Sequence, residues 1–114
     1  MITKSNFKEM ILDADVGFYA LSDTRFEKKY PEFDYTIQID FAMEQIIYQE
    51  GANGITVNDR TICNFNHPEN FVVLECVNRI LDKGYRPEHI ELERKWTLGH
   101  EQKSGKADIC VTDK

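Results

Sequence analysis

Every second residue from Tyr35 to Phe41 is hydrophobic, and the residues between them are polar. Side chains alternate between the two faces of a strand, so this spacing predicts a half-buried strand. The segment 44–50 is compatible with a strand or a helical turn, and its two β-branched residues favour a strand. Segments 55–57 and 61–65 predict a further strand pair with Asn58-Asp59 as the turn between them. The first part of the chain is therefore expected to contain a β-meander.

A short helix is predicted before the meander. Hydrophobic residues between Phe7 and Ala14 recur at intervals of three and four positions, and Ser5 or Asn6 is placed to cap the helix. The charged segment 26–30 predicts a helical turn that ends before Pro31, because the residue preceding a proline is disfavoured in the helical conformation.

The strongest helical pattern is a hydrophobic stripe from Phe71 to Leu81. Asn66 offers a cap before it, Pro68 suits the first turn, and Lys83-Gly84 is typical of a helix end.

Glu75 lies at the margin of this stripe. Its carboxylate has three alternatives: it is solvated, it pairs with Arg79 one turn later, or it points toward a site.

The last quarter of the chain predicts two strands joined by a basic connection. Residues 90–98 alternate apolar and polar positions, and a second strand is expected to begin at Ala107. Asp108 stands in that second strand, where burying an unpaired carboxylate costs several kcal/mol. It is therefore expected to be paired or to bind a metal, unless the strand begins at an exposed edge and Asp108 faces water. Lys103 and Lys106, in the connection, are candidate contacts for nucleic-acid phosphates.

Composition narrows the class of protein. A chain of 114 residues with 11% aromatic residues is large enough for one real core, and a formal net charge of −6 makes nucleic-acid binding depend on a local basic patch or a metal ion.

Three cysteines without a C-x-x-C pair are expected to be reduced thiols of a cytoplasmic protein, and a zinc site built from Cys63 and His67 is disfavoured. No apolar run is long enough to cross a bilayer, so no membrane partner is expected.

Three segments in the second half of the chain occur in an informative order. They are Asn70-Phe71-Val72-Val73-Leu74-Glu75, then Lys83-Gly84-Tyr85-Arg86-Pro87-Glu88-His89-Ile90-Glu91-Leu92-Glu93, and then Gly105-Lys106-Ala107-Asp108-Ile109-Cys110-Val111. Together they resemble the amino-terminal nuclease region of type I restriction enzyme R subunits and of related restriction and DNA-methylase fusion proteins. The resemblance covers residues 66–114, whereas residues 1–65 are only weakly similar to leader segments of such proteins.

This resemblance implies an α+β fold in which a helix packs on a mixed or antiparallel sheet. Residues 66–114 would form an incomplete restriction-endonuclease-like core, and residues 1–65 a preceding helix and β-meander. In the family, an Asp and a Glu-x-Lys on neighbouring strands act with Mg²⁺ on the scissile phosphate. Asp108 matches the metal-binding Asp, and Glu75 matches a helix position that assists the metal in some members. Both are thus candidate catalytic and metal-binding residues, with magnesium expected in the intact protein.

The sequence departs from the family pattern at the Glu-x-Lys. That motif should follow the strand of Asp108, but the three such triplets, Glu27/Lys29, Glu93/Lys95 and Glu101/Lys103, all precede it. Glu93/Lys95 lies on a predicted strand and offers an alternative, permuted site. We therefore expect a fragment of a longer protein, which by itself binds a divalent metal poorly and does not cut DNA.

Two functions from different classes follow. The first is a fragment of a type I restriction enzyme R protein, a DNA endonuclease that hydrolyses phosphodiesters with Mg²⁺ when intact. Its partners would be duplex DNA and other subunits or domains of a restriction-modification complex. The second is a non-catalytic scaffold or interaction domain of a restriction-modification or DNA methylase protein. Self-association of the fragment through an open sheet edge is also expected.

Overall fold

The computed structural model describes residues 2–98 and 103–112, and the side chains of these residues except those of 94–108. It contains two α-helices, α1 (Phe7–Leu12) and α2 (Pro68–Asp82). The strands are β1 (Tyr19–Ala20), β2 (Arg25–Tyr30), β3 (Tyr35–Asp40), β4 (Gln45–Tyr48), β5 (Thr56–Val57), β6 (Ile90–Leu98) and β7 (Lys103–Val111). Short 3₁₀ helices lie at Pro31–Phe33, Arg60–Cys63 and Pro87–His89.

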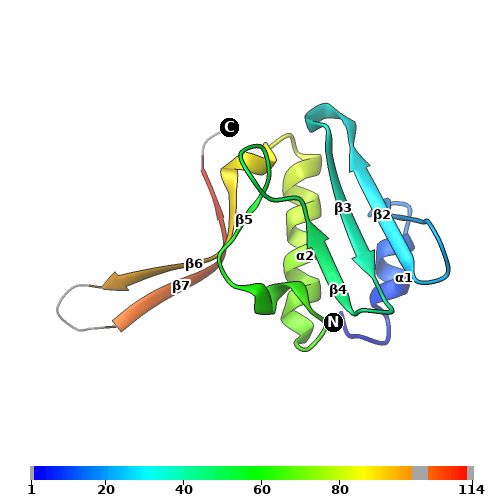
Figure 1. Cartoon of the computed structure of the whole chain (residues 1–114), viewed down its shortest axis with the longest axis horizontal. Helices are drawn as coiled ribbons and strands as arrows, with labels where there is room; N and C mark the ends of the chain where they lie inside the picture. Colours follow the sequence, from blue (N-terminus) through cyan, green and yellow to red (C-terminus); the bar gives the residue numbers. More distant parts are fainter. Residues whose placement is uncertain (1, 99–102, 113–114) are drawn as a thin grey trace.

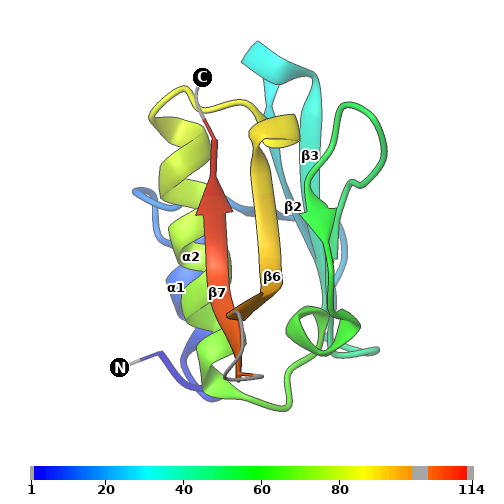
Figure 2. The ribbon, with the colours of Figure 1, turned by 90° about the vertical axis from the view of Figure 1, so that its left-hand side faces the viewer.

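The described strands form two sheets. An antiparallel sheet has the order β1-β2-β3-β4, and a mixed sheet has the order β5-β6-β7. Figures 1 and 2 together show α1 and α2 on one side of the strands, while the β6–β7 hairpin extends away from the body. The predicted α+β class is thus confirmed.

The predicted strand at 35–41 and the predicted helix over 71–81 are both confirmed. Strand β3 buries Tyr35, Ile37 and Ile39 on one face, as their alternation requires. Helix α2 begins at Pro68, although its N-cap is His67 instead of Asn66. It ends at Asp82, and Gly84 shortly after it has a φ of +97°, a conformation that residues with a Cβ rarely adopt.

The prediction of a helical turn at 26–30 was wrong, because this segment is strand β2. It pairs with β3 over its whole length and buries Phe26 at 2% and Tyr30 at 4% exposure. The residue between them on the same face is Lys28, which is not apolar. A lysine on the inward face interrupts the alternation that would have revealed the strand.

The predicted strand pair around Asn58-Asp59 was also wrong. Residues 60–63 form a 3₁₀ helix, because the Asp59 carboxylate accepts a hydrogen bond from the Thr61 N–H at 3.0 Å and caps it. Strand β5 instead pairs in parallel with β6, and α2 lies in the connection between them. Local capping therefore replaces the expected hairpin, and the long crossover suits a parallel pair.

One hydrophobic core joins the first 65 residues to the rest of the chain. The Phe7 ring of α1 stacks on Phe71 of α2 with their centroids 4.3 Å apart. Phe65 packs edge-on against both rings, and Phe41 contacts Phe7 and Phe65. Aromatic pairs of this kind contribute beyond the area they bury. Helix α2 is therefore held by residues from the N-terminal segment.

Lys28 connects the antiparallel sheet to α2 by polar contacts. Its Nζ donates to the Val16 carbonyl at 2.6 Å, to Asn78 Oδ1 at 2.7 Å and to the Asp82 carboxylate at 2.9 Å. Asn78 Oδ1 also accepts from the Tyr30 hydroxyl at 2.7 Å. Only 14% of the Lys28 side chain is exposed, so its charge depends on these partners.

We expect Lys28→Met to lower the free energy of unfolding by about 2 kcal/mol, because it removes charge-assisted hydrogen bonds and leaves their acceptors without this donor. Urea denaturation followed by circular dichroism measures the change. Lys29→Met is the matched control, since its side chain is 65% exposed on the opposite face of β2, and it should change stability by less than about 0.5 kcal/mol. Equal losses in the two variants would contradict a special role for Lys28.

Candidate functional site

The β6–β7 hairpin and the adjoining helix α2 carry the residues that the sequence singled out. Strands β6 and β7 pair in antiparallel fashion with Leu92 opposite Ile109 and Arg94 opposite Ala107. The same register on both sides places Glu93 and Asp108 across from each other. Strand β7 also contacts α2, so the predicted acidic strand adjoins the predicted helix.

Asp108 lies within a strand, as predicted, and its side chain lies outside the described part of the structure. Its neighbour Ile109 packs against the hydrophobic core, and the Thr112 N–H donates to the His89 carbonyl at 2.9 Å. The strand of Asp108 is therefore anchored to the body on its C-terminal side.

Glu93 is a feature of the hairpin that the sequence gave little reason to select. Glu93 occupies one of the polar positions of the predicted strand 90–98, yet the residue is only 6% exposed. Its φ of +57° is in the left-handed region, which is uncommon for a residue other than glycine and is enriched at functional sites. The only sequence signal was the Glu93-x-Lys95 triplet. The strand register places Glu93 opposite position 108 of the hairpin.

Glu75 lies on α2 and forms an ion pair with Arg79 one turn later. The carboxylate side chain is 17% exposed, whereas that of Arg79 is 70% exposed. Of the three alternatives, the structure thus shows the pairing of Glu75 with Arg79. Such a pair on a helix surface stabilises it by only about 0.3–0.5 kcal/mol, so it would yield readily to a stronger ligand.

Lys103 and Lys106 are positioned on strand β7, with Leu98 and Lys95 as their respective partners on β6. Their side chains lie outside the described part of the structure. The prediction that the second strand begins at Ala107 was wrong, because β7 already begins at Lys103. Pairing with the long strand β6 outweighs the low strand propensity of the serine and glycine that follow Lys103.

The cysteines do not form a metal site with the histidines in the described residues. Cys63, Cys76 and Cys110 are free thiols, and burial raises the pKa of Cys63. Within residues 2–98 and 103–112, apart from the side chains of 94–108, no group of three or more His, Cys, Asp or Glu side chains is placed to hold a metal ion.

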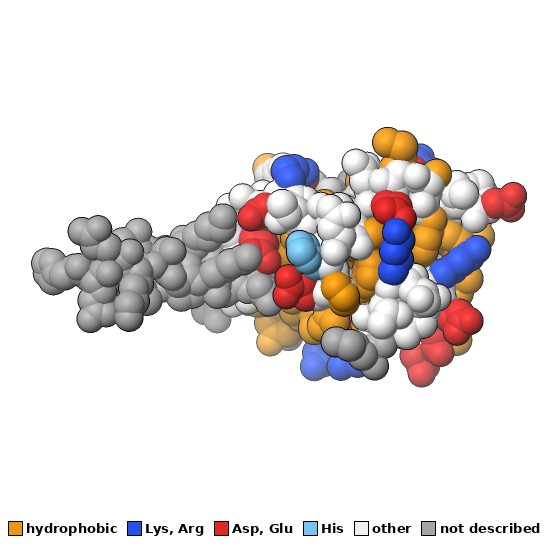
Figure 3. All heavy atoms as spheres, turned by 90° about the horizontal axis from the view of Figure 1, so that it is seen from below, with side chains coloured by type: hydrophobic (Ala, Val, Ile, Leu, Met, Phe, Trp, Pro, Cys, Tyr) orange, Lys and Arg blue, Asp and Glu red, His pale blue; other side chains and the backbone are white. Residues whose placement is uncertain are grey.

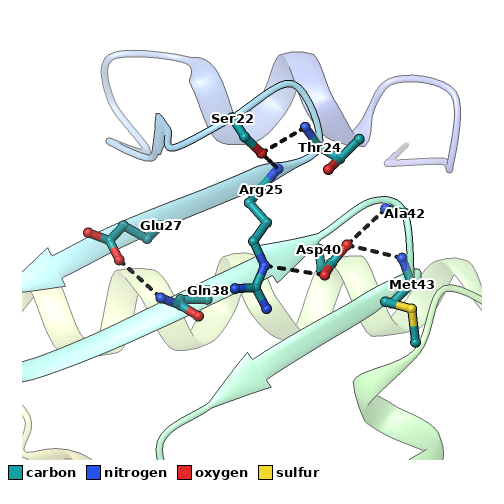
Figure 4. A network of polar contacts seen from close by, with 8 residues as sticks. All are labelled: Ser22, Thr24, Arg25, Glu27, Gln38, Asp40, Ala42 and Met43. Carbon is teal, nitrogen blue, oxygen red and sulfur yellow. Dashed lines mark hydrogen bonds and ion pairs between the residues drawn. The ribbon is translucent and has the colours of Figure 1, made fainter.

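A second polar network covers the outer face of the antiparallel sheet (Figure 4). Asp40, at the end of β3, accepts hydrogen bonds from the Ala42 and Met43 N–H groups at 2.9 and 3.0 Å and from Arg25 Nε at 3.3 Å. These bonds, that from Met43 above all, lower the pKa of Asp40. Because its oxygens are used to close the turn between β3 and β4, we interpret Asp40 as structural.

Glu27 is a second buried acid of this outer face, at 8% exposure. Its carboxylate accepts hydrogen bonds from the Tyr19 hydroxyl and from Gln38 Nε2, the latter at 3.2 Å. The bond from Tyr19 is the main cause that lowers the pKa of Glu27, and the bond from Gln38 adds to it. Glu27 thus joins β1, β2 and β3.

Comparison with protein-family models, with curated proteins and with solved structures finds no match to this chain. Neither described helix has the length and apolar character that crossing a membrane requires.

Tyr19→Phe should destabilise the protein in a pH-dependent manner. The lost hydrogen bond lets the pKa of Glu27 rise toward its usual 4.5. A lowered pKa in the folded state contributes stability above the unfolded pKa, and this contribution is lost as the pH falls through the folded pKa. Thermal unfolding at several pH values should therefore show that the wild type is more stable than the variant at pH 7. This difference in stability should shrink once the pH falls below the pKa of an ordinary glutamate. A difference that stays constant down to acid pH would contradict this linkage.

Proposed function

We propose that α2, β6 and β7 belong to the metal-dependent nuclease core of a restriction or restriction-modification protein that acts on duplex DNA. The observation that carries the proposal is the position of Asp108. It lies on a strand that adjoins the helix of Glu75 and pairs with the strand of Glu93. Together with the order of motifs from residue 66 to residue 114, this arrangement favours a restriction-endonuclease-like core.

The types of donor fit magnesium, because Asp108, Glu93 and Glu75 all offer carboxylate oxygens. Asp108 would be the principal ligand, with Glu93 beside it and Glu75 in a supporting role. When bound, the ion would stabilise negative charge on the scissile phosphate. Glu75 is already balanced by Arg79, and release of that pair would make its carboxylate accessible.

The contribution of the chain itself is positional. The core packing of Ile109 and Leu92 fixes the hairpin at the level of Glu93 and Asp108. Buried residues on rigid strands hold a site more accurately than residues on loops.

Plasmid cleavage tests the proposal with the natural gene product that contains residues 1–114. We expect Mg²⁺-dependent cleavage of duplex DNA, with Asp108→Asn reducing the rate at least about a hundredfold, as expected for loss of a charge-stabilising group. Asp23→Asn is the matched control, because Asp23 is an exposed turn residue, and it should leave the rate unchanged. Cleavage that needs no metal, or that survives Asp108→Asn, would contradict the proposal.

A non-catalytic interaction domain is the second candidate. The ion pair between Glu75 and Arg79 favours it, because it gives Glu75 a structural role that needs no metal. In that case the gene product would bind other domains of a restriction-modification protein and would lack Mg²⁺-dependent cleavage altogether. The same plasmid assay therefore separates the two candidates.

A further inference from the structure

The distal part of the β6–β7 hairpin projects from the body as a two-stranded ribbon (Figure 1). We define the arm as residues 94–98 and 103–107, which are paired over their whole length from Arg94 opposite Ala107 to Leu98 opposite Lys103. The longest extent of the molecule, 50 Å, lies along the direction in which the arm projects. The paired strands of the arm thus lie outside the body of the molecule in this view.

The charge of the arm is opposite to that of the rest of the chain. The arm contains four cationic residues, Arg94, Lys95, Lys103 and Lys106, and no acidic residue. Without these four charges, the formal net charge of −6 becomes −10 for the remainder. On the face of the body seen in Figure 3, acidic and basic side chains are interspersed. A polyanion would thus be attracted to the arm and repelled by the chain as a whole, which orients its approach.

We propose that the arm enters a groove of duplex DNA and binds its phosphates. This inference rests on the proposed function for the choice of DNA as the partner. The major groove of B-form DNA is about 12 Å wide and admits a two-stranded β-ribbon. Five residue pairs at roughly 3.3 Å per residue give the arm a reach of about 16 Å, enough to follow the groove past several base pairs.

The pairing register of the arm places cationic residues on both faces of the ribbon. Lys95 and Lys106 are directly opposite each other, so they share one face of the ribbon. Arg94 and Lys103 occupy alternate positions and belong to the other face. Cations on both faces can approach the phosphates of both DNA strands that border a groove.

In the register of the arm, Trp96 pairs with Gly105. It is the single tryptophan of the chain. An aromatic residue on a ribbon that enters a groove would lie close to the sugars and base edges of the duplex. Because this tryptophan is in the arm, its fluorescence reports changes around the arm.

Fluorescence anisotropy with a labelled DNA duplex, measured in EDTA to prevent cleavage, tests the proposal. Four phosphate contacts should make log K fall with log salt at a slope of about −3.6. The arm variant Arg94→Gln, Lys95→Gln, Lys103→Gln, Lys106→Gln should bind at least about tenfold more weakly and lose most of this slope. Binding should also quench Trp96 in the wild type.

The matched control is the body variant Lys4→Gln, Lys8→Gln, Lys29→Gln, Lys83→Gln, which removes four exposed lysines and changes the net charge by the same amount. We expect this variant to bind DNA with an affinity within about twofold of the wild type, because its substitutions weaken only the long-range electrostatic attraction. Equal losses in the two variants would overturn the proposal, because binding would then follow net charge alone. DNA binding without any change in Trp96 fluorescence would overturn it as well, even if the arm variant failed to fold.

Competition identifies the partner. Duplex RNA has a major groove too deep and narrow for side chains to read, so it should compete less well than duplex DNA. Stronger competition by RNA or by anionic lipid vesicles would overturn the choice of DNA. Failure of this proposal and failure of the nuclease proposal can be told apart, because Asp108→Asn should lower cleavage at least about a hundredfold while DNA binding by the arm persists.

Discussion

Packing of helix α2 is the constraint on which the rest of the structure depends. Its apolar stripe must cover strands from both sheets, and its Phe71 ring is stacked on Phe7 from the first helix. Its polar margin is held by Lys28 through Asn78 and Asp82. The hairpin that carries the acidic positions rests on the same helix. The N-terminal 65 residues thus share one continuous core with the segment that carries the candidate site. A substitution in the core of either part therefore affects the packing of the other.

The parts of the fold that could be predicted are those in which local pattern and tertiary environment agree. Strand β3 alternates cleanly, and α2 combines a stripe, an N-terminal proline and a terminal glycine. Strand β2 was missed because Lys28 stands on its inward face, where only the partners on α2 and at Val16 make a lysine acceptable. The 3₁₀ helix at 60–63 was missed because Asp59 caps it locally, which competes with a strand. Both errors come from polar contacts that hydrophobic spacing does not report.

The residues of the candidate site were selected from the sequence, whereas their arrangement required the structure. Asp108 and Glu75 came from the order of motifs, whereas the position of Glu93 opposite Asp108 required the strand register. The burial of Glu93 is a tertiary property, and its left-handed backbone conformation has no signature in a charged segment. The arm was likewise hidden, because Lys103 and Lys106 were expected in a loop and Arg94 and Lys95 in a separate strand. Pairing brings the four cations onto one ribbon, and the two acidic positions 93 and 108 lie at its base.

In the proposed site, the hairpin holds a cation through Asp108 with Glu93 beside it. Paramagnetic Mn²⁺, a substitute for Mg²⁺ with similar oxygen ligands, tests this directly when it is titrated into ¹⁵N-labelled protein. Even weak binding broadens the amide signals of residues near the ion. If the ion binds at Asp108, the amide signals of residues 93 and 108 should broaden selectively. Residue 75 should show a smaller effect, and strands β2 and β3 should show none. Broadening that is centred on the acidic residues of the N-terminal segment, or that is uniform along the chain, would contradict it.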